Sequence, residues 1–90
     1  MQCDLQQVEE YASLFLKVDE IALLLNIDYE EFRREIKSKS SDISKAYYRG
    51  KLKTMIELRK QTLEFAQKGS PQAEAAMLDF LSKQNLSENA

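Results

Sequence analysis

Apolar residues recur at intervals of three and four along almost the whole chain, which is the spacing that places them on one face of a helix. The sequence holds few runs of β-branched residues and only 2 glycines in 90 residues. It therefore predicts an all-α fold, in which a helix-turn-helix head of three helices precedes a long helix and a C-terminal helix. The five helices are expected over residues 5–15, 18–25, 28–37, 42–67 and 71–83.

The expected helices fall into a head and a following segment. The head covers residues 1–40 and the helical segment covers residues 41–84, both within one compact unit. Gly69 is expected to end the long helix, and Ser70 is expected to cap the last one. Residues 85–90 lack helical periodicity, so we expect a disordered tail there.

Residues 18–37 show the order of features that a helix-turn-helix needs. Ala22 is small enough for a close helix crossing, and Asn26 tolerates the left-handed backbone of a sharp turn. Asp28 and Glu31 together form a capping-box-like start for the next helix. The expected core of the head consists of Tyr11, Phe15, Ala22, Leu25, Ile27, Phe32 and Ile36. An ordinary helical hairpin can show the same order, so both arrangements remain open.

The helix predicted over residues 42–67 is longer and more apolar than a single small domain needs. At about 1.5 Å per residue it extends about 39 Å, whereas a compact chain of this size is about 30 Å across. Its apolar positions cover two sectors instead of one stripe, which predicts burial on two sides. Gly50 costs about 1 kcal/mol relative to alanine inside a helix, so it predicts the close approach of another helix.

One apolar sector of this helix would remain exposed on an isolated chain, and soluble monomers seldom tolerate a large apolar patch. We therefore expect the chain to self-associate, and either a dimer or a ring would cover the exposed apolar sector. Tyr47 is expected in the core and Tyr48 in a packing or interface position, because neighbouring helix positions point about 100° apart. The candidate oligomer interface consists of Tyr48, Leu52, Met55, Ile56 and Leu63.

Composition disfavours several classes of protein. The chain has no histidine and a single cysteine, Cys3, so neither an internal disulfide nor a zinc site is expected. No apolar run approaches the roughly 18 residues that span a bilayer, and the N-terminus lacks a secretory signal pattern. The sequence therefore predicts a cytoplasmic protein without a membrane partner.

The sequence holds no arrangement of residues that is typical of catalysis. Glu9–Glu10 and Glu30–Glu31 are adjacent acids, which a helix points about 100° apart, so we expect them to be solvated. A glycine-rich phosphate loop, a Ser–His or Cys–His pair and metal-ligand spacing are all missing from the sequence. We therefore expect a non-catalytic protein without a cofactor.

Charge is distributed unevenly, although 13 basic and 15 acidic residues give a net charge of only −2. Residues 44–68 hold seven basic and two acidic residues, while residues 1–27 are acidic overall. Proteins that bind nucleic acid usually show a basic footprint, so any contact with phosphate here has to be local and sensitive to salt.

Double-stranded DNA is a candidate partner because of the residues on the third predicted helix. In a helix-turn-helix, the early part of the second helix meets base edges, and basic residues further along meet phosphate. The candidate base-facing residues are Tyr29, Glu30 and Arg33, and the candidate phosphate contacts are Arg34, Lys37, Lys39, Arg49, Lys51 and Lys53. A plain solvated face, in which Glu30 and Glu31 pair with neighbouring arginines, is the alternative.

Three short segments follow one another in a characteristic order: Ala46-Tyr47-Tyr48-Arg49-Gly50-Lys51, Glu57-Leu58-Arg59, and Ala66-Gln67-Lys68-Gly69-Ser70-Pro71-Gln72-Ala73. This order resembles the region just after the DNA-binding head of small terminase subunits from tailed phages. The resemblance implies a helix-turn-helix head followed by a helical segment that assembles subunits into a ring. It also implies recognition of packaging sites on phage DNA in the bacterial host cell, regulation of a terminase large subunit, and no catalytic activity.

Two other functions remain open from the sequence. The chain could be a helical interaction or oligomerisation module that keeps the head without binding DNA. It could also be a small prophage transcriptional regulator that shares the head alone. Measurements of mass in solution and of DNA binding distinguish these possibilities.

Overall fold

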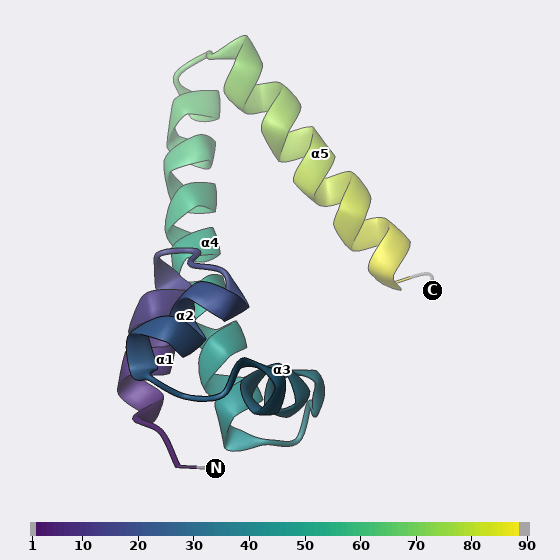
Figure 1. Cartoon of the computed structure of the whole chain (residues 1–90). Helices are drawn as coiled ribbons and strands as arrows, with labels where there is room; N and C mark the ends of the chain where they lie inside the picture. The colour runs from purple at the N-terminus through teal and green to yellow at the C-terminus, as the bar shows by residue number, and fades with distance from the viewer. Residues whose placement is uncertain (1, 89–90) are drawn as a thin grey trace. The chain divides into compact units, whose positions relative to one another are not determined.

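The computed structural model describes residues 2–88, and Figure 1 shows the path of the chain. Its five helices are α1 (Leu5–Ser13), α2 (Val18–Leu25), α3 (Tyr29–Lys37), α4 (Asp42–Gln67) and α5 (Pro71–Glu88). No strand occurs within residues 2–88, which confirms the predicted all-α fold.

The chain divides into two compact units, Met1–Met55 (unit 1) and Ile56–Ala90 (unit 2). Unit 1 contains α1, α2, α3 and the N-terminal half of α4, and unit 2 contains the rest of α4 together with α5. This division differs from the single unit that we expected and from the expected boundary between residues 40 and 41. It falls inside α4 because the buried residues of that helix all lie in its first half, where they complete the core of unit 1.

The core of unit 1 is built by apolar residues from all four of its helical segments. The buried apolar residues are Val8, Ala12, Ile21, Ala22, Phe32, Ile36, Ile43, Ala46 and Tyr47. Burial of Ala22, Phe32 and Ile36 confirms their predicted place in the head's core. The predicted core residues that are partly buried and pack against this cluster are Tyr11, Leu25 and Ile27.

The prediction that Phe15 belongs to this core is wrong. α1 ends at Ser13, earlier than expected, and Phe15 lies in the following turn with a φ of 60°. Its side chain is 45% exposed. Because the helix has already ended, the helical spacing that brings Val8 and Ala12 to the core no longer determines where Phe15 lies.

The connection between α2 and α3 has the local geometry that the sequence predicts. Asn26 ends α2 in the left-handed conformation, with a φ of 55° and a ψ of 47°. The Ile27 N–H donates to the carbonyl oxygen of Ala22 at 3.1 Å. The Asp28 carboxylate accepts a hydrogen bond from the Glu31 N–H at 3.0 Å, which caps α3. The chain therefore reverses within a few residues, and α2 and α3 pack against each other.

The contact between α1 and α4 depends on Gly50, which is buried. A Cβ atom at this position would overlap with the carbonyl oxygen of Glu9 and lie 3.0 Å from the Cβ atom of Ala12. The prediction that Gly50 marks the close approach of another helix is therefore confirmed, and α1 is that helix. The Thr54 hydroxyl, one turn further along α4, donates to the carbonyl oxygen of Ser13.

Two serines connect the end of α3 to the start of α4. Ser41 Oγ donates to the Glu35 carbonyl oxygen at 2.7 Å and accepts from the Ser44 N–H at 3.0 Å, so Ser41 caps α4. Ser44 is 1% exposed, and its Oγ donates to the Ile36 carbonyl oxygen at 2.8 Å. These bonds hold the first turns of α4 beside the last turn of α3.

Unit 2 consists of two helical segments joined by a tight turn. Gly69 has a φ of 94°, which suits glycine, and Ser70 Oγ accepts from the Ala73 N–H at 3.3 Å, as the sequence predicts. The Arg59 guanidinium lies 4.7 Å from the centre of the Phe80 ring, which links α4 to α5 within this unit. Within residues 56–84, no side chain is fully buried.

The last helix is longer than we expected. α5 continues to Glu88, whereas we expected it to end near Lys83. The sequence after Pro71 contains neither glycine nor proline, so no local signal stops the helix there. Residues 85–88 of the expected disordered tail therefore belong to α5, and residues 89–90 lie outside the described part of the chain.

Candidate nucleic-acid interface

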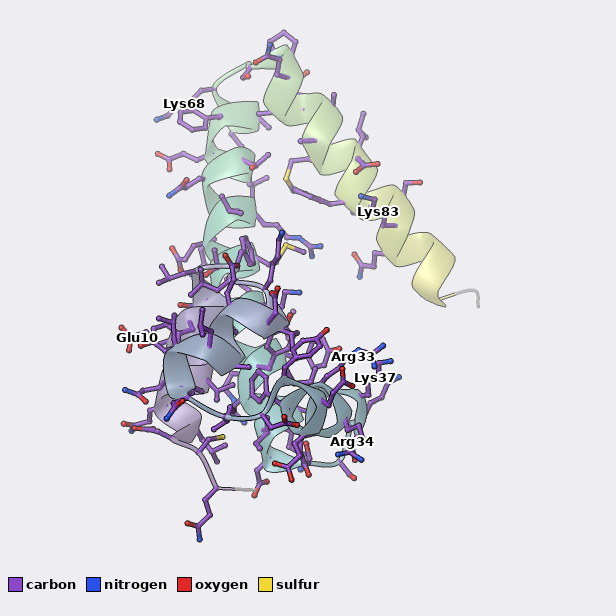
Figure 2. The ribbon with its side chains drawn as sticks, in the orientation of Figure 1. Glu10, Arg33, Arg34, Lys37, Lys68 and Lys83 are labelled. Carbon is purple, nitrogen blue, oxygen red and sulfur yellow. The ribbon has the colours of Figure 1, made fainter. Side chains whose placement is uncertain are left out.

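α3 is amphipathic, and its two faces separate the core from the solvent. Phe32 and Ile36, one turn apart, lie on its buried face. Its exposed residues include Tyr29, Glu30, Arg33, Arg34 and Lys37. Figure 2 shows Arg33, Arg34 and Lys37 extending outward from this helix. α3 therefore carries five of the nine side chains that the sequence predicts for base and phosphate contact, whereas Lys39 lies in the following loop and Arg49, Lys51 and Lys53 lie on α4.

Four exposed basic residues lie in α3 and the loop after it. This basic group consists of Arg33, Arg34, Lys37 and Lys39. None of its members forms an ion pair within the described part of the chain. Arg34 Nε donates instead to the carbonyl oxygen of Glu30 at 3.4 Å. Within the described residues, therefore, no ion pair joins Glu30 or Glu31 to a neighbouring arginine, although the alternative interpretation of this face expected one.

Charge changes sign along α3. Its first turn carries Glu30 and Glu31, and its last turn carries Arg34 and Lys37. This order suits the helix dipole, which favours anions near the N-terminus and cations near the C-terminus. The positive charge that could meet phosphate therefore lies toward the C-terminal end of α3 and in the loop that contains Lys39.

Two of the candidate phosphate contacts on α4 are engaged by a carboxylate on α1. Arg49 Nη1 lies 3.4 Å from one carboxylate oxygen of Glu9, and Lys53 Nζ pairs with the other oxygen. The hydrogen bond from Lys53, helped by the charges of both cations, holds the pKa of Glu9 below its usual range. We expected Glu9 to be solvated, but its side chain is only 23% exposed. A phosphate would have to compete with Glu9 for Arg49 and Lys53, and their contact with DNA stays a prediction.

The third basic residue predicted on α4 packs against an aromatic ring. Lys51 Nζ lies 5.0 Å from the centre of the Tyr47 ring, in a cation–π contact. Tyr47 is buried, and its ring meets the ring of Tyr48 edge to face, with the centroids 5.1 Å apart. Tyr48 is 48% exposed. The predicted burial of Tyr47 is therefore confirmed, and the interface role of Tyr48 stays a prediction.

The candidate oligomer interface is exposed, as expected, and lies entirely on α4. In unit 1 its residues are Tyr48, Leu52 and Met55, and in unit 2 they are Ile56 and Leu63. Leu52 is the most exposed of the five, at 58%. Side chains of this kind are suited to contact with a second copy of the chain, and self-association stays a prediction.

No family model matches the chain, and no curated protein or solved structure matches it. Within the described residues, no helix combines the length and the apolar character that crossing a membrane requires. The functional assignment therefore depends on the residues of α3 and α4 themselves and on the order of motifs in the sequence.

Proposed function

We propose that this chain is a non-catalytic protein that binds double-stranded DNA, resembles the small terminase subunits of tailed phages, and recognises viral DNA for packaging in the cytoplasm of a bacterial host. The observation that supports this most directly is the exposed basic group of α3 and its loop, which forms no ion pair within the described residues. The helix follows a sharp turn at Asn26, as a DNA-binding helix-turn-helix requires.

In the proposed complex, α3 lies in the major groove of the duplex. Tyr29, Glu30 and Arg33 face base edges, and the rest of the basic group meets phosphates. Arg33 has the fork geometry that binds guanine through two hydrogen bonds. Glu30 is compatible with this surface because a carboxylate can accept from the amino group of cytosine.

The affinity of one chain for DNA is expected to be modest. Its net charge is −2, and the proposed interface contains only a few of its 13 basic residues. Several heads that bind one duplex together raise the overall affinity, because each later contact is intramolecular. Self-association through α4 supplies such an arrangement. A ring of subunits and regulation of a terminase large subunit follow as further parts of the proposal from the family resemblance.

Reversing the charge of two members of the basic group tests this proposal. The double variant Arg33→Glu with Arg34→Glu is expected to abolish DNA binding, because it places two carboxylates where the proposed interface needs cations. Both residues are exposed, so the fold is expected to persist, which far-UV circular dichroism checks. Fluorescence anisotropy of a labelled duplex at about 50 mM salt measures the binding.

The matched control is Lys60→Glu with Lys83→Glu in unit 2. It changes the net charge of the chain by the same amount, at two lysine side chains that are each 70% exposed. This control is expected to retain most of the wild-type affinity. Equal losses in both double variants, or unchanged binding in the α3 variant, would show that α3 does not carry the contact.

A second candidate function is a helical module that self-associates without binding DNA. The specific observation in its favour is that each side chain of the candidate oligomer interface defined above is exposed. Both functions share this surface, so they are separated by the DNA-binding test and not by the mass of the assembly.

Self-association has its own test. Light scattering at tens of micromolar is expected to give a mass above the 10.4 kDa of one chain. Leu63→Glu is expected to lower that mass, because a carboxylate in an apolar contact loses its hydration without a partner. Gln61→Glu adds the same charge at an exposed polar position and is expected to leave the mass unchanged. A monomeric wild-type chain would refute the predicted interface.

A further inference from the structure

A cleft lies where the loop after α3 meets the first turns of α4. It has a volume of about 500 Å³ and is lined by Lys39, Ser44, Lys45 and Tyr48. Ser44 Oγ donates to the Ile36 carbonyl oxygen at 2.8 Å, so this bond fixes the wall of the cleft to the last turn of α3. The cleft therefore adjoins the end of α3 where the basic group is concentrated.

The charge of the cleft is entirely positive. Lys39 and Lys45 are exposed and form no ion pair within the described residues, and no carboxylate lines the cleft. Two other hollows of unit 1 differ because acidic side chains line them. Asp42 lines both, Glu35 also lines one of them, and Glu9 also lines the other. Of these three hollows, only the cleft presents two cations without an acid, so it is the one that favours an anion.

Tyr48, the aromatic side chain of the cleft, is held by the core. The ring of Tyr48 meets the buried ring of Tyr47 at an interplanar angle of 82°, an edge-to-face contact that limits its freedom. Tyr48 brings a phenol hydroxyl, and Lys39 and Lys45 bring ammonium groups. All three groups donate hydrogen bonds, whereas a phosphate offers only acceptors at neutral pH, so the cleft and a phosphate are complementary.

We infer that this cleft binds a backbone phosphate of double-stranded DNA beside the base-reading face of α3. The inference rests on the DNA-binding function proposed above and adds Lys45 and Tyr48 to the contact surface. It removes Tyr48 from the candidate oligomer interface, because a hydroxyl covered by a second copy could not reach phosphate. The cleft is open to solvent, so a phosphate on the surface of a duplex can reach it. A contact of this kind orients the protein on the duplex and carries no sequence information.

The double variant Lys39→Gln with Lys45→Gln tests the cleft through the salt dependence of DNA binding. The slope of log affinity against log salt is expected to become shallower by about 1, because the cleft binds one phosphate and each neutralised phosphate contributes about 0.9. The loss of affinity is expected to be the same on unrelated duplexes, as it is for a contact with phosphate. Tyr48→Phe is expected to weaken binding several-fold while it leaves the slope close to that of the wild type, because it removes a hydrogen bond and no charge.

Lys60→Gln with Lys83→Gln in unit 2 is the matched control. It removes the same amount of charge from exposed lysines and is expected to keep the wild-type slope. A second arm measures binding of inorganic phosphate alone, by calorimetry, to the wild type and to the Lys39/Lys45 variant. If phosphate binds the wild type but not the variant, while both bind the duplex with the same affinity and slope, the cleft is a site for free phosphate and the inference about DNA is wrong.

The remaining outcomes separate the cleft from the proposed function. The Lys39/Lys45 variant could keep the wild-type slope of log affinity against log salt while Arg33→Glu with Arg34→Glu abolishes binding. That result overturns the inference about the cleft and leaves the proposed function in place. Absence of duplex binding by the wild-type chain overturns both.

Discussion

Replacing Phe32 with alanine is expected to lower the free energy of unfolding by about 3–5 kcal/mol. Phe32 is the largest fully buried side chain among the described residues, so its loss leaves a cavity in the core of unit 1. The whole stability of a small domain is about 5–15 kcal/mol, and the variant therefore loses a large part of it. Thermal melting followed by far-UV circular dichroism is expected to show a midpoint at least about 12 °C lower.

Leu23→Ala is the control for this substitution. Leu23 lies on α2, the helix against which α3 packs, but its side chain is 81% exposed. Truncating an exposed side chain is expected to change the stability by no more than about 0.5 kcal/mol. If the two variants melt within a few degrees of each other, α3 does not pack on the core through Phe32.

Gly50→Ala is expected to destabilise the chain by about 1–3 kcal/mol, although alanine favours an isolated helix by about 1 kcal/mol. The added Cβ atom would overlap with the backbone carbonyl oxygen of Glu9, which cannot move without shifting α1. The sign of the effect is therefore diagnostic. Urea denaturation measures it, with Gln61→Ala at an exposed position of α4 as the control for helix propensity. A stabilising Gly50→Ala would show that α1 and α4 are further apart than described.

The sequence predicts the helices well where their ends carry chemical signals. Asn26 and Asp28 mark the turn between α2 and α3 because each has a specific backbone role there, and both roles are found. Gly69 and Ser70 mark the turn between α4 and α5 in the same way. α5 lacks such a signal near Lys83, and its end was accordingly placed too early.

Tertiary contacts explain what helical spacing could not predict. Phe15 has core-like spacing, but the chain leaves the helix before it, and no residue near Ser13 marks that point. Ser44 is buried because its hydroxyl satisfies the free carbonyl oxygen of Ile36, a bond that requires the packing of α4 beside α3. Ser44 stands between Ile43 and Lys45 in the sequence, so no local pattern signalled its burial.

The candidate site follows the same pattern. The exposed face of α3 could be predicted, because Phe32 and Ile36 fix which side of the helix is buried. The sequence could not show which basic residues of α4 pair with a carboxylate and which remain free to contact phosphate. Pairing of Glu9 with Arg49 and Lys53 depends on the approach of α1 to α4 over Gly50, which joins parts of the chain that are far apart in sequence.

A salt titration of wild-type binding to double-stranded DNA tests the central claim, that unit 1 binds DNA through α3, most directly. We predict measurable binding at about 50 mM salt and a linear fall of log affinity with log salt. Three phosphates contacted by the basic group give a slope of about −2.7 per chain, and Lys45 adds no further phosphate because it shares the one that Lys39 binds. Absence of binding at about 50 mM salt, or binding that does not change with salt, would contradict the claim.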